Sequence, residues 1–209
     1  QQSFTGEPAT IDLSIVIVNY NVREFLRQCL QSIDQSFHTL TTEVIVVDNN
    51  SQDQSVEVLR PLFPNVHFVA LNENLGFGKA NNIGIQRSRG RYILLLNPDT
   101  LIQEDTLSVM TAYMDSTSSV GIAGCKVLNA NGSFQVQCRR GFPGPWASFC
   151  KLFGLQSLFP RSPLFAQYNQ TFRDENETYT VDAVIGAFMF CRREPLFAIG
   201  GFDEEFFMY

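Results

Sequence analysis

The stretch ILLLNPDT (Ile93–Thr100) is a run of four apolar residues that ends in an amide, a proline and a carboxylate. Such an unbroken apolar run is typical of a parallel strand that is buried on both faces. Ligands of open parallel sheets bind at the carboxyl ends of the strands. Because Asn97 and Asp99 follow the run directly, the stretch predicts a buried strand with a polar site at its end.

Similar apolar runs alternate with helical patterns through the first half of the chain. Further strands are predicted in DLSIVIVNY (12–20), EVIVVDNN (43–50) and VHFVAL (66–71). Helices are predicted over 22–33, 51–63, 76–90 and 104–115. This alternation predicts an α/β fold with a mainly parallel central sheet and helices on both faces.

Three of these helices carry specific expectations. In the first, Phe25, Cys29, Leu30 and Ile33 recur at helical intervals and are expected on one face. Ser51 is expected to cap the second helix. In the last, the expected apolar face consists of Leu107, Met110 and Met114.

The pattern changes after about residue 118. Segment 120–138 predicts two strands around the turn NANG, and 141–178 is irregular with one short helix near WASFCKLFG (146–154). Segment 179–202 predicts a strand, a turn, a second strand and a short helix. With no repeat or linker, 1–209 is interpreted as one domain, with a nucleotide-binding half (1–118) and an acceptor-side half (119–209).

Composition narrows the class of protein. The chain has 15 basic and 21 acidic residues, a net charge of −6, which argues against a general nucleic-acid-binding face. It has no long uninterrupted apolar run and no signal-peptide pattern, so a cytoplasmic location is expected. Its five scattered cysteines favour unpaired thiols over a disulfide frame or a zinc site. The ends, QQSFTGEP and EEFFMY, suggest a segment of a longer protein.

Polar residues follow three of the predicted strands. Asp48 comes directly after a buried strand, where its carboxylate could accept a hydrogen bond from a ribose diol or a base N–H. Tyr20 either completes the edge of the core or stacks on a base. Asn49 and Asn50 either end the strand and cap the next helix or contact a ligand.

Asp99 carries the strongest indication of a metal site. Pro98 restricts the backbone before it, and Asn97 supplies a second oxygen on the same turn. Mg²⁺ or Mn²⁺ prefers such oxygen ligands and keeps water and substrate phosphates in its other positions. Asp99 is therefore predicted to hold a divalent cation whose charge offsets that of a bound diphosphate.

The segment NENLGFGKANNIG (72–84) resembles a phosphate loop only superficially. It has neither the G-x-x-x-x-G-K-S/T order nor the G-x-G-x-x-G order. Lys79 either neutralises a phosphate or is a solvent-exposed helix residue. Asn82 either binds the ligand or caps the turn.

Five fragments together resemble the family 2 glycosyltransferases. They are SIVIVNYN (14–21), VIVVDNNSQD (44–53), NLGFGKANNIGI (74–85), ILLLNPDT (93–100) and VIGAFMFCRREPLFAIGGFDEEFFMY (184–209). Their order and spacing follow the family. The resemblance implies a Rossmann-like nucleotide-diphospho-sugar transferase (GT-A) fold, and the NPD and FDE-x-FFMY forms are similar to the rhamnosyltransferase-like branch.

The resemblance also implies roles for individual residues. Asp48 would contact the base, and Asn97 and Asp99 stand where the family has its D-x-D metal motif. Gly76, Ala80, Asn82 and Gly84 match a G-x-x-x-A-x-N-x-G helix, in which Asn81 replaces a frequent arginine. The nucleotide-binding residues expected from sequence and resemblance together are Val18, Tyr20, Asp48, Asn50, Lys79, Asn82 and Asn97.

The acceptor side and the catalytic base follow from the same resemblance. Gly186, Ala187 and Phe188 are expected to shape the acceptor side. The base is expected beyond Tyr209. Asp203 and Glu204 are weak alternatives, because with Glu205 they also suit a capping and surface turn after GGF.

The expected function is transfer of a sugar, with inversion, from a UDP- or dTDP-sugar to a saccharide or lipid-linked acceptor in surface polysaccharide synthesis. One alternative is a non-catalytic nucleotide-sugar-binding module. Another is a dinucleotide-dependent oxidoreductase, which the missing G-x-G-x-x-G disfavours. The aromatic residues of 142–160 either pack locally or, with Lys151 and Arg161, contact a membrane or lipid-linked acceptor at its inner face.

Overall fold

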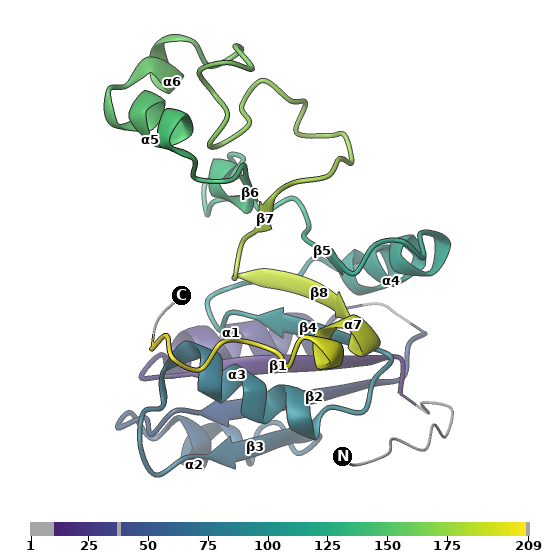
Figure 1. Cartoon of the computed structure of the whole chain (residues 1–209). Helices are drawn as coiled ribbons and strands as arrows, with labels where there is room; N and C mark the ends of the chain where they lie inside the picture. Colours follow the sequence, from purple (N-terminus) through teal and green to yellow (C-terminus); the bar gives the residue numbers. More distant parts are fainter. Residues whose placement is uncertain (1–10, 37–38, 208–209) are drawn as a thin grey trace. The chain divides into compact units, whose positions relative to one another are not determined.

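The structure, a computed structural model, describes residues 11–36 and 39–207. These residues form two compact units (Figure 1). The first unit comprises 11–123 together with 186–207, and the second comprises 124–185. This division differs from the expected halves, 1–118 and 119–209, because the last segment of the chain returns to the sheet of the first unit.

The first unit is built on one six-stranded sheet. Its strands are β1 (Leu13–Asn19), β2 (Thr42–Asp48), β3 (Val66–Ala70), β4 (Tyr92–Leu96), β5 (Ile122–Ala123) and β8 (Phe188–Arg192), in the order β3-β2-β1-β4-β8-β5. The first four strands pair in parallel, and β8 is antiparallel to both β4 and β5. The mainly parallel sheet predicted from the sequence is confirmed.

Helices cover both faces of this sheet. They are α1 (Arg23–Asp34), α2 (Ser55–Leu59), α3 (Gly76–Arg87), α4 (Thr106–Ser116) and α7 (Arg193–Ala198). Figure 1 shows α1 and α3 on opposite faces. Among the described residues, no helix is both long and apolar enough to cross a bilayer.

The second unit contains short elements. They are a 3₁₀ helix (Val136–Cys138), β6 (Arg139–Arg140), α5 (Pro145–Leu152), α6 (Leu155–Leu158) and β7 (Ala183–Val184). β6 and β7 form a separate antiparallel pair. The expected hairpin around NANG is short: it has one bridge, between Leu128 and Phe134, with backbone hydrogen bonds from Asn129 to Ser133 at 2.8 Å and from Gln135 to Val127 at 2.9 Å.

Two helix expectations require correction. α1 buries Leu26, Cys29, Leu30 and Ile33, whereas Phe25 is exposed. Leu26 completes the i, i+3, i+7 series, so Phe25 is rotated off the buried face. Ser51 does not cap α2, which begins at Ser55 after Gln54 in a left-handed conformation. The expected apolar face of α4 is confirmed, since Leu107, Met110 and Met114 are buried.

Close packing fixes α3 on the sheet. Ala80 lies in a cluster with Ile45 and Val47, at the centre of the parallel strands. A Cβ atom added at Gly84 would lie 2.3 Å from Cγ1 of Val16 in β1, so only glycine permits this approach. α3 is thereby held closely against β1 and β2.

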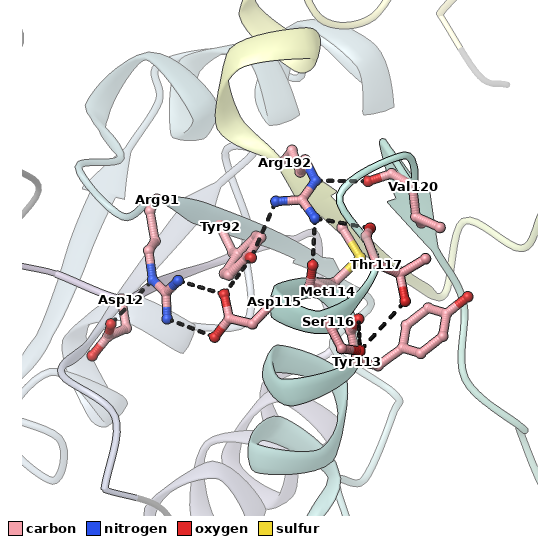
Figure 2. A network of polar contacts seen from close by, with 10 residues as sticks. All are labelled: Asp12, Arg91, Tyr92, Tyr113, Met114, Asp115, Ser116, Thr117, Val120 and Arg192. Atoms are coloured by element: carbon pink, nitrogen blue, oxygen red, sulfur yellow. Dashed lines mark hydrogen bonds and ion pairs between the residues drawn. The ribbon is translucent and has the colours of Figure 1, made fainter.

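A polar network lies at the amino end of the parallel strands, where β4 begins and α4 ends (Figure 2). Nη1 and Nη2 of Arg91 donate to the carboxylate of Asp115 at 2.5 and 3.0 Å, and Oη of Tyr92 donates to the same carboxylate at 2.7 Å. The hydrogen bonds from Arg91 lower the pKa of Asp115 below its usual range. These contacts bind α4 to the start of β4.

Arg192 satisfies the last carbonyl groups of α4 in the same network. Its guanidinium donates to the carbonyl oxygen of Val120 at 2.8 Å, to that of Thr117 at 3.0 Å and to that of Met114 (Figure 2). Carbonyl groups at a helix C-terminus have no partner within the helix. Arg192 therefore joins the end of β8 to the end of α4.

Replacing Arg192 by alanine should lower the free energy of unfolding by about 1–3 kcal/mol, since partly buried carbonyls lose a charged donor. Arg192→Lys keeps the charge but not the planar fork of donors, so we expect a similar loss. Urea denaturation followed by circular dichroism measures both. Arg87→Ala, at an exposed position, is the control and should change stability by less than about 0.5 kcal/mol. Wild-type stability of Arg192→Lys would contradict this role.

Candidate functional site

The carboxyl ends of β1 and β2 are aligned residue for residue. Asn19, the last residue of β1, lies opposite Asp48, the last residue of β2. The backbone N–H of Asn49 donates to the carbonyl oxygen of Asn19 at 2.8 Å, which continues the pairing beyond both strands. The loops that follow these strands therefore leave the sheet side by side, as expected for a ligand site.

Asp48 is buried and held at both carboxylate oxygens. Nδ2 of Asn19 donates to Oδ1 at 2.7 Å, and the backbone N–H of Ser51 donates to Oδ2 at 3.0 Å. Nδ2 of Asn19 also donates to Oγ of Ser51 at 3.0 Å. A carboxylate accepts about four hydrogen bonds, so Asp48 keeps acceptor capacity beyond these two.

The two loops are joined by further hydrogen bonds. Oγ of Ser51 accepts from the backbone N–H of Asn21 at 3.0 Å, and Oδ1 of Asn21 accepts from the backbone N–H of Gln52 at 2.7 Å. Asn21 and Asn50 have φ values of 56° and 63°, in the left-handed region. Asparagine tolerates this region better than most residues, which explains its use in both turns.

Asn49 connects the end of β2 to the start of α3. Its Oδ1 accepts from the backbone N–H of Leu75 at 2.8 Å, and its Nδ2 donates to the carbonyl oxygen of Gly76 at 3.1 Å. Of the two alternatives that the sequence left open, the structure therefore gives Asn49 a role in the fold. It fixes the first turn of α3 beside Asp48.

Asp99 lies on the loop after β4. It is exposed, and its carboxylate makes no hydrogen bond or ion pair within residues 11–36 and 39–207. Burial raises the pKa of the Cys29 thiol to about 12, and the negative charge of Asp99 contributes to the same shift. Cys29 is one of five cysteines, all described and all unpaired, as the sequence predicts. The exposed carboxylate of Asp99 lies at the same end of the parallel strands as Asp48.

Asn97 joins this loop to the segment before β8. Its backbone N–H donates to the carbonyl oxygen of Ala187 at 3.0 Å, and its carbonyl oxygen accepts from the N–H of Thr100 at 3.2 Å. The expected acceptor-side segment is therefore adjacent to the expected metal loop. Phe188 requires correction, because its side chain is 1% exposed and belongs to the core instead of an acceptor surface.

Asn82 holds the segment after α7 onto α3. Its Oδ1 accepts from the backbone N–H of Phe202 at 2.9 Å, while its Nδ2 donates to the carbonyl oxygen of Phe202 at 2.9 Å and to Oε1 of Glu204 at 3.0 Å. The amide is thus engaged by the protein itself. Of its two alternatives, the turn-holding role is the one that the structure supports.

The weak catalytic candidates lie in this turn. Glu204 accepts from Asn82, and Oδ1 of Asp203 accepts from the backbone N–H of Glu205 at 3.0 Å. The carbonyl oxygen of Phe207 accepts from the backbone N–H of Phe77 at 2.9 Å. The structure therefore accounts for both acids as parts of a turn that packs on the start of α3.

The remaining expected nucleotide-binding residues differ in exposure. Tyr20 is 48% exposed directly after β1, so it does not complete the core. Lys79 is on the exposed side of α3, with no hydrogen bond or ion pair among the residues that the structure describes. Val18 is half-buried and packs against the cluster of Ile45, Val47 and Ala80, which gives it a packing role.

Asn19 and Ser51 were missed as site residues by sequence reasoning. The signal for Asn19 was present in the sequence, since it is a polar residue at the end of an apolar run. The structure shows that it is fully buried. A buried amide needs hydrogen-bonding partners, which in the structure are Asp48 and Ser51. Ser51 carried no such signal, because a serine after Asn-Asn resembles any helix cap.

The fold and this edge can be compared with known proteins. Residues 14–199 match the family model described as glycosyl transferase family 2. The chain belongs to this family. A hexosyltransferase of low-salt glycan biosynthesis from Haloferax volcanii is 26% identical over 202 residues, which are 95% of this chain and 58% of that protein.

A second relative is a rhamnosyltransferase, like the branch of the family that the sequence resembles. The N-acetylglucosaminyl-diphospho-decaprenol L-rhamnosyltransferase of Mycobacterium tuberculosis is 26% identical over 212 residues, covering 94% of this chain and 66% of that protein. The chain therefore spans less than two thirds of the length of these two relatives. The family resemblance inferred from the five fragments is confirmed.

Two solved structures confirm the GT-A fold. TarS residues 1–349 of Staphylococcus aureus, in complex with UDP, superposes with a TM-score of 0.65 at 19% identity, covering 94% of this chain and 52% of that one. Mannosyltransferase PcManGT of Pyrobaculum calidifontis, in complex with GDP-Man and Mn²⁺, gives 0.64 at 17% identity, covering 95% and 51%.

Asn19→Ala should lower the free energy of unfolding by about 1–3 kcal/mol, because the buried carboxylate of Asp48 loses a donor. The loss includes the hydrogen bond to Ser51. Urea denaturation measures the change. Asn129→Ala, which removes an exposed amide bonded to Ser133, is the matched control and should shift stability by less than about 0.5 kcal/mol. Equal stability of the two variants would show that Asn19 does not hold Asp48.

Proposed function

We propose that the chain transfers a sugar from a UDP- or dTDP-sugar to a saccharide or lipid-linked acceptor in surface polysaccharide synthesis. The observation that carries the proposal is the common end of β1, β2 and β4 in a family 2 glycosyltransferase, where Asp48 is the last residue of β2 and Asp99 lies on the loop after β4. The relative from Mycobacterium tuberculosis, whose name specifies a polyprenol-diphosphate-linked acceptor, supports the acceptor class.

The nucleoside is proposed to bind at the end of β2. Asp48 has spare acceptor capacity, which suits the imide N–H of uracil or thymine. The exposed ring of Tyr20 is available to stack on the base. Because Asn19 and Ser51 hold the carboxylate in one orientation, little ordering is required when the base binds.

The diphosphate is proposed to bind at the loop after β4. The carboxylate of Asp99 fits a hard divalent cation, since its oxygens are exposed and unpaired within the described residues. Within those residues no group of three or more histidine, cysteine or acidic side chains could hold a metal ion, so Asp99 would share the cation with water and phosphate. Asn97 would place its amide oxygen on the same turn, and Lys79 would neutralise further phosphate charge.

The proposed reaction is a direct displacement that inverts the anomeric carbon. A hydroxyl oxygen of the acceptor forms the new bond to that carbon, the bond to the diphosphate oxygen breaks, and the hydroxyl proton passes to a general base. A bound Mg²⁺ or Mn²⁺ supplies charge that stabilises the departing diphosphate. Ala187, which is hydrogen-bonded to Asn97, and Gly186 before it would border the acceptor and leave room for a sugar.

Asp99→Ala should abolish the gain in UDP affinity that Mn²⁺ provides, because the cation loses its protein ligand. We expect a roughly 10- to 100-fold weaker Kd in the presence of Mn²⁺ and an unchanged Kd without it. Isothermal titration with UDP, with and without Mn²⁺, measures both values. Glu104→Ala removes another exposed acid after the same strand and is the control.

Three outcomes separate the proposal from its alternatives. Wild-type metal dependence in Asp99→Ala would overturn the assignment of the metal site. Protection by NAD but not by UDP in a thermal-shift assay would favour an oxidoreductase. Binding of UDP-sugars by the full-length protein without transfer to any saccharide or lipid-linked acceptor would favour a non-catalytic binding module.

A further inference from the structure

Helix α5 in the second unit exposes its large apolar residues and buries its small ones. Its buried residues are Ala147 and Cys150, three positions apart on one face. Trp146, Phe149 and Leu152, also spaced by three, are exposed, and Leu152 is 81% exposed. A helix that packs only on its own domain buries its largest apolar side chains. α5 instead directs them to the surface.

Neighbouring residues extend this face into one patch, here called the aromatic patch. The rings of Trp146 and Phe149 are stacked with their centroids 5.7 Å apart, and the ring centroids of Phe149 and Phe153 are 4.5 Å apart. Phe165 joins Phe159 to this group, since its ring centroid lies 5.2 Å from that of Phe159 and 6.2 Å from that of Trp146. The exposed members of the patch are Trp146, Phe149, Leu152, Phe153 and Phe159. An apolar surface of this kind typically marks an interaction site.

Basic residues predominate in the segment that carries the patch, although Asp182 reaches its start, where Oδ2 accepts from the backbone N–H of Phe142 at 2.8 Å. Residues 139–173 contain five basic residues and no acidic one, although the whole chain has a net charge of −6. The basic residues are Arg139, Arg140, Lys151, Arg161 and Arg173. Lys151 and Arg161 are exposed beside the patch, and Nζ of Lys151 lies 3.8 Å from the ring centroid of Tyr168. Arg139 is buried, whereas Lys151, Arg161 and Arg173 are exposed, so the segment that carries the patch also carries exposed positive charge.

We propose that the aromatic patch docks the protein onto an anionic lipid bilayer. Aromatic side chains favour the headgroup level of a membrane, and basic residues beside them are attracted to anionic lipids. Nε1 of Trp146 donates to the carbonyl oxygen of Leu164 at 2.9 Å, so insertion of the ring leaves no unpaired donor. The contact is peripheral, and it does not depend on the proposed sugar transfer.

Trp146 makes the proposal directly measurable, because it is the only tryptophan of the chain. Vesicles of phosphatidylcholine with phosphatidylglycerol should shift its fluorescence to shorter wavelength and should sediment with the protein. Vesicles of phosphatidylcholine alone should bind more weakly. The double variant Leu152→Ser/Phe153→Ser should reduce partitioning by at least about tenfold, since two exposed apolar side chains no longer enter the bilayer.

Two further variants test each half of the proposal. Lys151→Glu/Arg161→Glu should abolish the preference for phosphatidylglycerol. Leu62→Ser/Val109→Ser, which removes two exposed apolar residues from the first unit, is the matched control and should partition like the wild type. Circular dichroism and urea midpoints establish that all variants are folded.

Several results would overturn the proposal. One is the absence of wild-type sedimentation and of any fluorescence shift with either vesicle. Another is equal partitioning of the wild type and Leu152→Ser/Phe153→Ser. A third is a wild-type dimer that dissociates in Leu152→Ser/Phe153→Ser while neither protein binds vesicles, because the patch would then be covered by a second copy of the chain.

Discussion

Parallel pairing of β1 with β2 and β4 is the constraint on which the candidate site depends. The register sets Asn19 opposite Asp48 and Ile17 opposite Leu96, so three loops begin at one edge of the sheet. A shift of β2 by one residue would exchange its two faces and remove Asp48 from Asn19. The apolar faces of the strands therefore determine the position of the carboxylate as well as the stability of the core.

The strands and the polar edge could be predicted because their signals are local. Apolar runs such as ILLL (93–96) and VIVV (44–47) admit few interpretations, and the residues after them necessarily lie at strand ends. Partners that lie far apart in the sequence could not be predicted. Asn82 contacts Phe202 across 120 positions of sequence, and no spacing rule links the two. Phe188 likewise follows a turn but enters the core as the first residue of β8.

The division of the chain into two units could not be predicted from the sequence, because of the order in which the strands join the sheet. A boundary near residue 118 is visible as a change of pattern, but β8 returns to pair antiparallel with β4 after the second unit. Antiparallel and parallel strands buried on both faces have the same apolar composition, so FMFCR (188–192) does not reveal its direction. Arg192 at the end of this strand secures the return by binding the end of α4.

Asparagine side chains make several of the contacts that join the segments around the site. An amide both donates and accepts, so Asn49 and Asn82 each pair with two backbone groups of another segment. An aspartate at position 82 would lose the donor and place its charge beside Glu204. Asn19 likewise donates to Asp48 where a second acid would repel it. Because amides provide these structural contacts, the carboxylate of Asp99 makes no hydrogen bond or ion pair within the described residues, as the proposed cation site requires.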